Sequence, residues 1–214
     1  YSVREIIHQA SDSGMEVILA MSNFYKIIKE AQPHTRVRKV ILATIKEALP
    51  PVTRLLFKLF IEKKGGHRVS TLAAGDLWMK DLIARHRPEE RPLVKVEPDD
   101  FGLLQYSGGT TGISKGAIAL HRNLVANALQ IRKWFHIVIE GQETMLLALP
   151  MFHVFGMVAG MLFAVQAAAT MIMVPNPRDI EDVIANINKY HPTLYPGVPT
   201  MYNALNNHPK IGRA

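Results

Sequence analysis

Short apolar runs alternate with longer amphipathic stretches along the chain. The runs EVILA and KVILA, at 16–20 and 39–43, are too short for helices and rich in β-branched residues, so they predict buried strands. Five further strands are expected at 102–106, 116–120, 145–149, 170–174 and 193–195. Helical spacing predicts helices at 23–30, 76–87, 122–135, 156–167, 179–190 and 199–206. This alternation predicts an α/β fold with a mostly parallel, covered sheet and flanking helices.

The most apolar window, MFHVFGMVAGMLFAVQAAATMIMV at 151–174, is as long as a membrane-spanning helix. His153 and Gln166 interrupt it, and the TMIMV run at its end has the composition of a strand. We therefore expect a buried helix that runs into a strand.

A second amphipathic segment, PVTRLLFKLFIEKKGG at 51–66, interrupts the α/β alternation. Its apolar residues follow helical spacing, and it also carries Arg54, Lys58, Lys63 and Lys64. A basic amphipathic helix can lie on anionic lipid, although such a helix more commonly packs its apolar face on its own domain. The sequence leaves both alternatives open.

A charged linker, RPEERPLVKVEPDD, contains three prolines and is the best candidate for a boundary. It divides the chain into a first α/β segment, 1–97, and a second α/β segment, 98–214. The chain lacks an initiator Met, and both of its ends have the pattern of interrupted amphipathic helices. We therefore expect a piece of a longer protein.

Composition narrows the class of partner. The 214 residues are 48% hydrophobic, which is enough for a packed core. They include no Cys, which fits a reducing compartment. The formal charge of +7 favours anionic partners such as nucleotides or acidic lipid. No basic patch interleaved with aromatic residues is present, so no nucleic-acid partner is expected. Without a secretory signal, the expected location is cytoplasmic. Peripheral contact at the inner face of the membrane through 51–66 is an open alternative.

The glycine-rich stretch YSGGTTGISKG, at 106–116, follows an apparent buried strand. Its glycines permit positive φ and let backbone N–H groups approach a ligand, and its hydroxyls and lysine add donors. Such a set of donors suits a polyphosphate. The residues concerned are Ser107, Gly108, Gly109, Thr110, Thr111, Gly112, Ser114 and Lys115.

Two other motifs overlap this stretch. The Walker A loop needs its Lys after the last Gly and a helix behind it, whereas Lys115 precedes Gly116 and a strand is expected next. Residues 112–116 match G-x-S-x-G, but the strand before it and the helix after it, which a nucleophile elbow needs, are missing. A serine hydrolase that uses Ser114 is therefore the less favoured alternative.

At these motifs the sequence resembles the adenylate-forming superfamily, and bacterial long-chain fatty-acid–CoA ligases within it are the most similar. YSGGTTGISKG resembles the phosphate loop of that family, with Ser114 where Pro is usual. HRNLVAN at 121–127, LPMFHVFGM at 149–157 and YPGVPTMYNAL at 195–205 resemble later motifs. The resemblance spans nearly the whole chain and implies part of the large N-terminal domain of such an enzyme.

The resemblance implies that a fatty acid attacks ATP to form an acyl-adenylate, and that coenzyme A then displaces AMP. The glycine-rich stretch would hold the β- and γ-phosphates, with Mg²⁺ bridging phosphate oxygens and Lys115 acting in catalysis. His153, which alone reads as a packed core histidine, would help to place the carboxylate. Gly156, Val198, Pro199 and Thr200 would shape the acyl pocket. The histidine spacings predict no metal site built by the protein.

Motifs that the family needs for adenine, ribose and Mg²⁺ binding are absent from this sequence, as is the small C-terminal domain. The resemblance therefore implies that the isolated chain is inactive. The alternative from a different class is a non-catalytic module that binds anions or a membrane surface.

Overall fold

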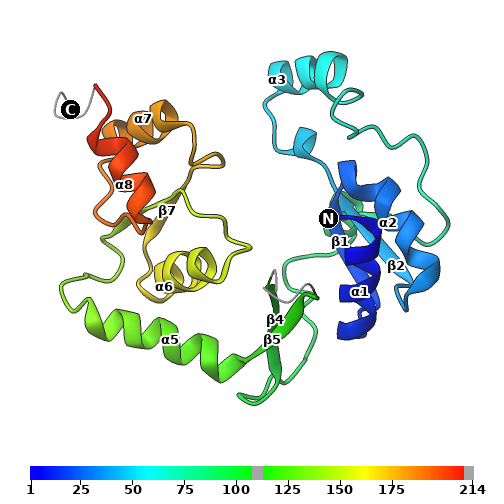
Figure 1. Cartoon of the computed structure of the whole chain (residues 1–214), viewed down its shortest axis with the longest axis horizontal. Coiled ribbons are helices and arrows are strands. Elements are labelled where there is room, and N and C mark those ends of the chain that lie inside the picture. Colours follow the sequence, from blue (N-terminus) through cyan, green and yellow to red (C-terminus); the bar gives the residue numbers. More distant parts are fainter. Residues whose placement is uncertain (108–112, 210–214) are drawn as a thin grey trace. The chain divides into compact units, whose positions relative to one another are not determined.

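The computed structural model describes residues 1–107 and 113–209. They group into two compact units, one made of Tyr1–Lys95 with Tyr106–Ala117 and the other of Val96–Gln105 with Ile118–Ala214 (Figure 1). The first division lies two residues before the end of the expected first segment. The flanks of the glycine-rich stretch group with the first unit, whereas the sequence placed them in the second segment.

The first unit contains a parallel three-stranded sheet in the order β1-β2-β3. Val17 pairs with Lys39, and Ile41 pairs with Leu77. The strands are β1 (Val17–Met21), β2 (Lys39–Ala43) and β3 (Leu77–Trp78). The helices and helical turns are α1 (Val3–Ser13), η1 (Ser22–Phe24), α2 (Tyr25–Ala31), η2 (Gln32–His34), η3 (Ile45–Glu47), α3 (Pro51–Leu56), η4 (Phe57–Ile61) and α4 (Met79–Arg85).

Helix α1 packs on this sheet and has its own start and stop signals. Ser2 and Glu5 form a reciprocal capping box, and Gly14 ends the helix with a left-handed φ of 66°. The helix thus begins at Val3, where the sequence pattern suggested a helix already under way. The core below it consists of Ala10, Ile28, Val37, Val40 and Leu42.

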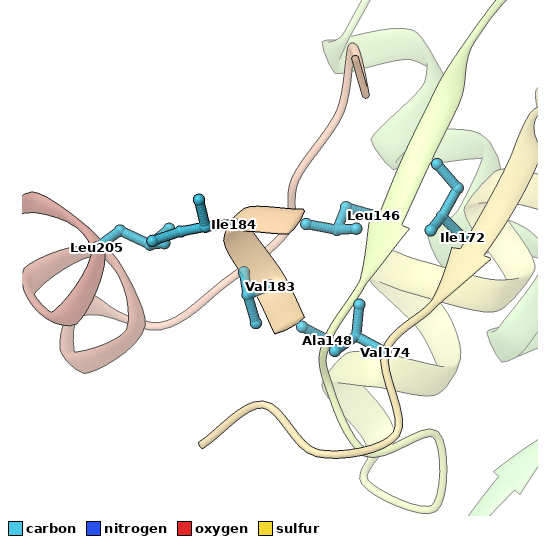
Figure 2. Close-up of a cluster of buried hydrophobic side chains, with 7 residues drawn as sticks. All are labelled: Leu146, Ala148, Ile172, Val174, Val183, Ile184 and Leu205. Carbon is cyan, nitrogen blue, oxygen red and sulfur yellow. The ribbon is translucent and has the colours of Figure 1, made fainter. Parts of the chain in front are cut away.

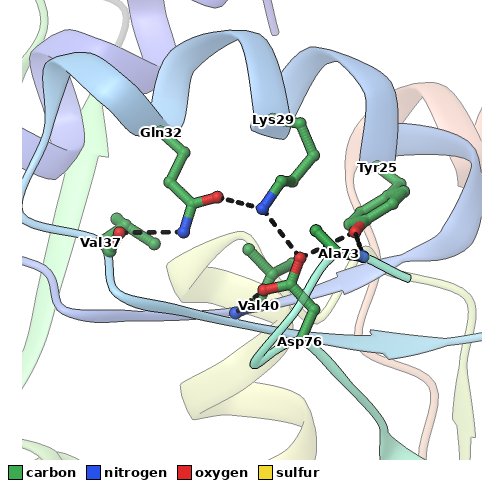
Figure 3. Close-up of polar contacts among 7 residues, drawn as sticks. All are labelled: Tyr25, Lys29, Gln32, Val37, Val40, Ala73 and Asp76. Atoms are coloured by element: carbon green, nitrogen blue, oxygen red, sulfur yellow. Dashed lines mark hydrogen bonds and ion pairs between the residues drawn. The ribbon is translucent and has the colours of Figure 1, made fainter.

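A buried carboxylate joins α2 to the sheet (Figure 3). Asp76 accepts hydrogen bonds from the Tyr25 hydroxyl at 2.7 Å and the Val40 N–H at 3.1 Å, and its ion pair with Lys29 spans 2.9 Å. Burial by itself would raise the pKa of Asp76, but the bonds from Lys29, Tyr25 and Val40 outweigh it and lower the pKa. Asp76 is therefore ionised, and it links β2 to α2 through its bonds to Val40 and to Tyr25 and Lys29.

The second unit is built on the parallel pair β6 (Thr144–Leu147) and β7 (Thr170–Met173). Leu146 and Ile172 from these strands meet Val183, Ile184 and Leu205 from two helices, as Figure 2 shows. A second cluster, on the side of α6, includes Met145, Leu147 and Phe163. The helices are α5 (His121–Trp134), η5 (Gly156–Leu162), α6 (Phe163–Gln166), α7 (Ile180–Tyr190) and α8 (Pro199–Asn206).

The apolar window at 151–174 forms η5 and α6 and then strand β7, as predicted. Gly160 lets η5 approach β6 closely, because an added Cβ would lie 2.5 Å from Leu147 Cδ2. No helix in the described part of the chain combines the length and apolarity that crossing a membrane requires.

The α/β class with parallel pairing and flanking helices is confirmed. Two local predictions were wrong. Residues 193–195 form no strand, and Leu194 makes only an isolated parallel bridge to Met145. The helix expected from 76 begins at Met79, because Leu77 and Trp78 pair with β2 first.

Candidate functional site

Two strands frame the glycine-rich stretch. They are β4 (Phe101–Ser107) and β5 (Lys115–Leu120), which form a two-stranded sheet. Gly102 lies beside Ala119 at one end and Gly116 beside Tyr106 at the other, so the strands run antiparallel. Ser107 ends β4 and Lys115 begins β5 as an exposed residue. The remaining predicted phosphate ligands, Gly108, Gly109, Thr110, Thr111 and Gly112, lie outside the described residues.

Tyr106, the first residue of this stretch, packs across the strand pair. A Cβ at Gly116 would lie 2.9 Å from Tyr106 Cζ, so the glycine makes room for the ring. The Tyr106 hydroxyl donates to Asp12 Oδ2 at 2.5 Å. Burial, followed by the hydrogen bond and the charge of Asp12, raises the pKa of Tyr106. The phenol therefore stays protonated and acts as a fixed donor to α1.

The other flank is also fixed to α1. His8 Nε2 donates to the carbonyl oxygen of Ser114 at 2.7 Å, and the rings of His8 and Tyr106 meet edge to face. His8 and Asp12 are four residues apart and so share a helix face. One face of α1 thus holds both ends of the glycine-rich stretch. The residue after Ser114 begins strand β5.

Sequence reasoning did not single out His8 or Asp12. Their partners are 106 and 94 residues away along the chain, and the local sequence HQASD matches no motif. Only the position of α1 within the first unit shows that these polar residues contact the flanks of the phosphate-loop candidate.

A cavity of about 570 Å³ in the second unit brings together three of the predicted substrate-pocket residues: His153, Val198 and Thr200. We call it the His153 cavity. Its walls come from the loop after β6, the turn before α7 and the first turns of α8. The other lining residues are Ala148, Leu149, Pro150, Phe152, Phe155, Pro177, Arg178, Ile180, Met201 and Ala204. Most of these are apolar, so the cavity suits a hydrocarbon chain.

His153 is exposed and held by local backbone contacts. The ring Nδ1 of His153 accepts a hydrogen bond from the Phe155 backbone N–H at 3.2 Å. The backbone N–H of His153 donates to the Pro150 carbonyl at 3.0 Å. A neutral imidazole that accepts at Nδ1 carries its proton on Nε2. The side chain can therefore donate one hydrogen bond to a carboxylate in the cavity.

Two further predicted pocket residues, Gly156 and Pro199, are chain neighbours of lining residues and are not themselves part of the lining. Gly156 is buried, and an added Cβ would lie 2.4 Å from the Pro150 carbonyl oxygen. Its hydrogen thus lets η5 approach the backbone that carries His153, while the acyl-chain role expected for it remains a prediction. Pro199 is the first residue of α8, a position where its fixed φ suits the helix.

Arg178 lines the cavity and was missed by the sequence analysis. It is exposed, and its backbone N–H donates to Asn176 Oδ1 at 3.2 Å in the turn that follows β7. A signal was available, because polar residues just beyond the carboxyl end of a parallel strand commonly face a ligand site. Arg178 thus adds a basic residue to the mostly apolar lining, and a guanidinium can bind a carboxylate.

Within residues 1–107 and 113–209, no group of three or more His, Cys, Asp or Glu residues is placed to hold a metal ion.

Comparison with known proteins defines the family. The model of the AMP-binding enzyme family matches residues 1–214. The long-chain-fatty-acid–CoA ligase of Escherichia coli O157:H7 is 33% identical over 97% of this chain, and that of Bacillus subtilis is 30% identical over 99%. The chain spans only 37% and 38% of the lengths of these relatives.

Solved structures share the fold. The anthranilate–CoA ligase AuaEII, in complex with anthranoyl-AMP, superimposes with a TM-score of 0.71 and 17% identity. The match covers 96% of this chain and 35% of that one. Because the family model covers every residue from the first to the last, this chain belongs to the AMP-binding enzyme family.

Proposed function

We propose that the whole protein is an ATP-dependent fatty-acid–CoA ligase. A carboxylate oxygen attacks the α-phosphorus of ATP, and the bond from that phosphorus to the pyrophosphate oxygen breaks. The coenzyme A thiolate then attacks the acyl carbon and releases AMP. The observation that carries the proposal is the His153 cavity, whose mostly apolar lining includes His153 and Arg178.

The first step joins two anions, so the main task of the protein is to offset their repulsion. Lys115, exposed at the start of β5, supplies a charge at the edge of the glycine-rich stretch. Mg²⁺, when bound, would neutralise part of the phosphate charge, and no protein ligand for it is assigned here. The proposed phosphate ligands are Ser107, Gly108, Gly109, Thr110, Thr111, Gly112, Ser114 and Lys115.

In the His153 cavity, the acyl chain would lie against the apolar wall that includes Val198, with Thr200 beside it. The carboxylate would be held by His153 Nε2–H, whose ring is fixed by the Phe155 N–H. Held in this way, the carboxylate would keep one orientation while the hydrocarbon lies away from water.

Exchange of labelled pyrophosphate into ATP in the presence of fatty acid tests the phosphate site in the whole protein. We expect Lys115→Ala to reduce exchange by about a hundredfold, the effect of losing one charge-stabilising donor. Lys80→Ala removes a similarly exposed lysine from α4 and should leave exchange unchanged. Undiminished exchange in Lys115→Ala would remove this lysine from the site, and labelling of Ser114 by a fluorophosphonate would favour a hydrolase.

We also infer that the 214 residues alone do not complete the reaction, because they span little more than a third of the relatives' length. Thioester formation by the isolated chain from fatty acid, ATP and coenzyme A would overturn this inference. A ligase that uses ATP and coenzyme A would work in the cytoplasm.

A further inference from the structure

Helix α3 and the π-helical turn η4 expose a row of large apolar side chains, which we call the α3 apolar face. Val52, Leu55, Leu56 and Leu59 follow the i, i+3, i+4, i+7 spacing of one helix side, and Phe60 extends it. Between 50% and 73% of the surface of each of these residues is exposed. An apolar surface of this extent rarely stays in contact with water unless it has a binding partner.

The other side of the same segment is anchored in the first unit. Phe57 is buried and contacts the His67 ring edge-on at 5.5 Å. Glu62 is also buried, and its carboxylate pairs with Lys46. The backbone carbonyl of Glu62 accepts from the His67 N–H at 2.9 Å. The segment is therefore fixed by Phe57 and Glu62, while the α3 apolar face is turned away from its own unit. In Figure 1, α3 stands clear of the sheet strands β1 and β2 of that unit.

Cations border the α3 apolar face. Lys58, Lys63 and Lys64 are exposed, and Arg54 donates to the Leu49 carbonyl at 3.0 Å while remaining at the surface. Glu62 is the one carboxylate in 51–66, and its ion pair with Lys46 neutralises it. The surface around the apolar row is therefore positively charged, and it complements a partner that is apolar inside and anionic at its edge.

We propose that α3 and η4 lie in the headgroup region of an anionic phospholipid membrane, with the α3 apolar face toward the acyl chains. A convex helix with leucine and phenylalanine on one side and lysines beside them matches the chemistry of that interface. A protein groove would match the apolar row but would not by itself explain the surrounding lysines. The inference goes beyond the ligase function and does not depend on it, because it concerns binding alone.

Vesicle flotation of the whole protein tests this contact with two kinds of change. Wild type should float with vesicles that contain phosphatidylglycerol, and much less with phosphatidylcholine alone or at high salt. Lys58→Glu with Lys63→Glu should weaken partitioning by at least about 25-fold, since each cation near the surface contributes about fivefold. Leu59→Ser with Phe60→Ser should weaken it by more than about tenfold. All four side chains are exposed, so the fold should tolerate these changes.

Matched controls lie on α4 and in the linker. Lys80→Glu with Arg85→Glu changes the net charge equally, and Ile83→Ser with Leu93→Ser removes two exposed apolar side chains. Both controls should float like wild type. Equal flotation of the α3–η4 variants and their controls would overturn the proposal. So would self-association that Leu59→Ser with Phe60→Ser abolishes in a protein that binds no vesicles, since the face would then be an interface between copies.

Discussion

His8 donates from Nε2 to the carbonyl of Ser114, 2.7 Å away, across 106 positions of sequence. Four residues further along α1, Asp12 accepts from the Tyr106 hydroxyl at 2.5 Å. Tyr106 and Ser114, near the two ends of the glycine-rich stretch, are therefore fixed to one helix face. If the glycine-rich stretch binds phosphate as proposed, holding its ends in this way reduces the reordering needed when nucleotide binds.

His8→Ala tests this arrangement through the proposed activity. Loss of one hydrogen bond should raise the KM for ATP by about fivefold in pyrophosphate exchange and change the KM for fatty acid little. His8→Gln, whose amide can reach the same carbonyl, should recover most of the loss. His34→Ala, an exposed histidine in η2, is the control. Equal KM values for ATP in His8→Ala and wild type would show that this contact is only structural.

Gly156→Ala tests the close approach of η5 to the turn that carries His153. The added Cβ would lie 2.4 Å from the Pro150 carbonyl oxygen, and backbone cannot move aside as a side chain can. We expect the free energy of unfolding to fall by about 1–3 kcal/mol, measured by urea denaturation.

Gly160→Ala is the matched control in the same helical turn, because its Cβ would meet only the side chain of Leu147. It should destabilise the protein less than Gly156→Ala does. The reverse order would contradict the packing described here.

Arg178→Met tests the cation of the His153 cavity. If the guanidinium binds the substrate carboxylate, its loss should raise the KM for fatty acid by about 10- to 100-fold, the range for a charge-assisted hydrogen bond. The KM for ATP should stay the same. Arg85→Met, on α4, removes an exposed arginine elsewhere and should change neither value. A change in kcat with both KM values unchanged would contradict a role for Arg178 in substrate binding.

Local patterns predicted most of the fold because they are enforced locally. The run KVILA became β2 within the bounds expected, and Pro199 starts α8 where its fixed φ suggested. Residues 193–195 differ from the prediction because Leu194 forms an isolated parallel bridge to Met145 in place of a strand. Leu77 and Trp78 form a strand because they pair with β2, whose residues are far away in sequence.

The candidate site divides in the same way. His153, Val198 and Thr200 belong to recognisable motifs, and the structure brings them into one cavity. His8 and Asp12 have no motif, because their role comes from where α1 packs. Sequence can indicate residues that bind a ligand through their own chemistry, whereas residues that position a loop become visible only in three dimensions.

The buried carboxylate of Asp76 makes the stability of the first unit depend on pH. Its pKa in the folded state is lowered, so its stabilising contribution is present above the ordinary value of 3.8 and is lost as the pH falls through the folded pKa. Asp76→Asn should therefore reduce the free energy of unfolding by about 2 kcal/mol at neutral pH, since the bonds from Lys29, Tyr25 and Val40 lose a charged acceptor. The difference from wild type should shrink below that value.

The fluorescence of Trp78, which lies in β3 two residues after Asp76, reports on unfolding of this unit. The other tryptophan, Trp134, is exposed and can be replaced by Phe. Urea unfolding followed by Trp78 fluorescence at several pH values would measure the difference. Asp81→Asn, in the first turn of α4, controls for the loss of a carboxylate. A difference between Asp76→Asn and wild type that stays constant as the pH falls would mean that uncharged packing, rather than the ionised carboxylate, joins α2 to the sheet.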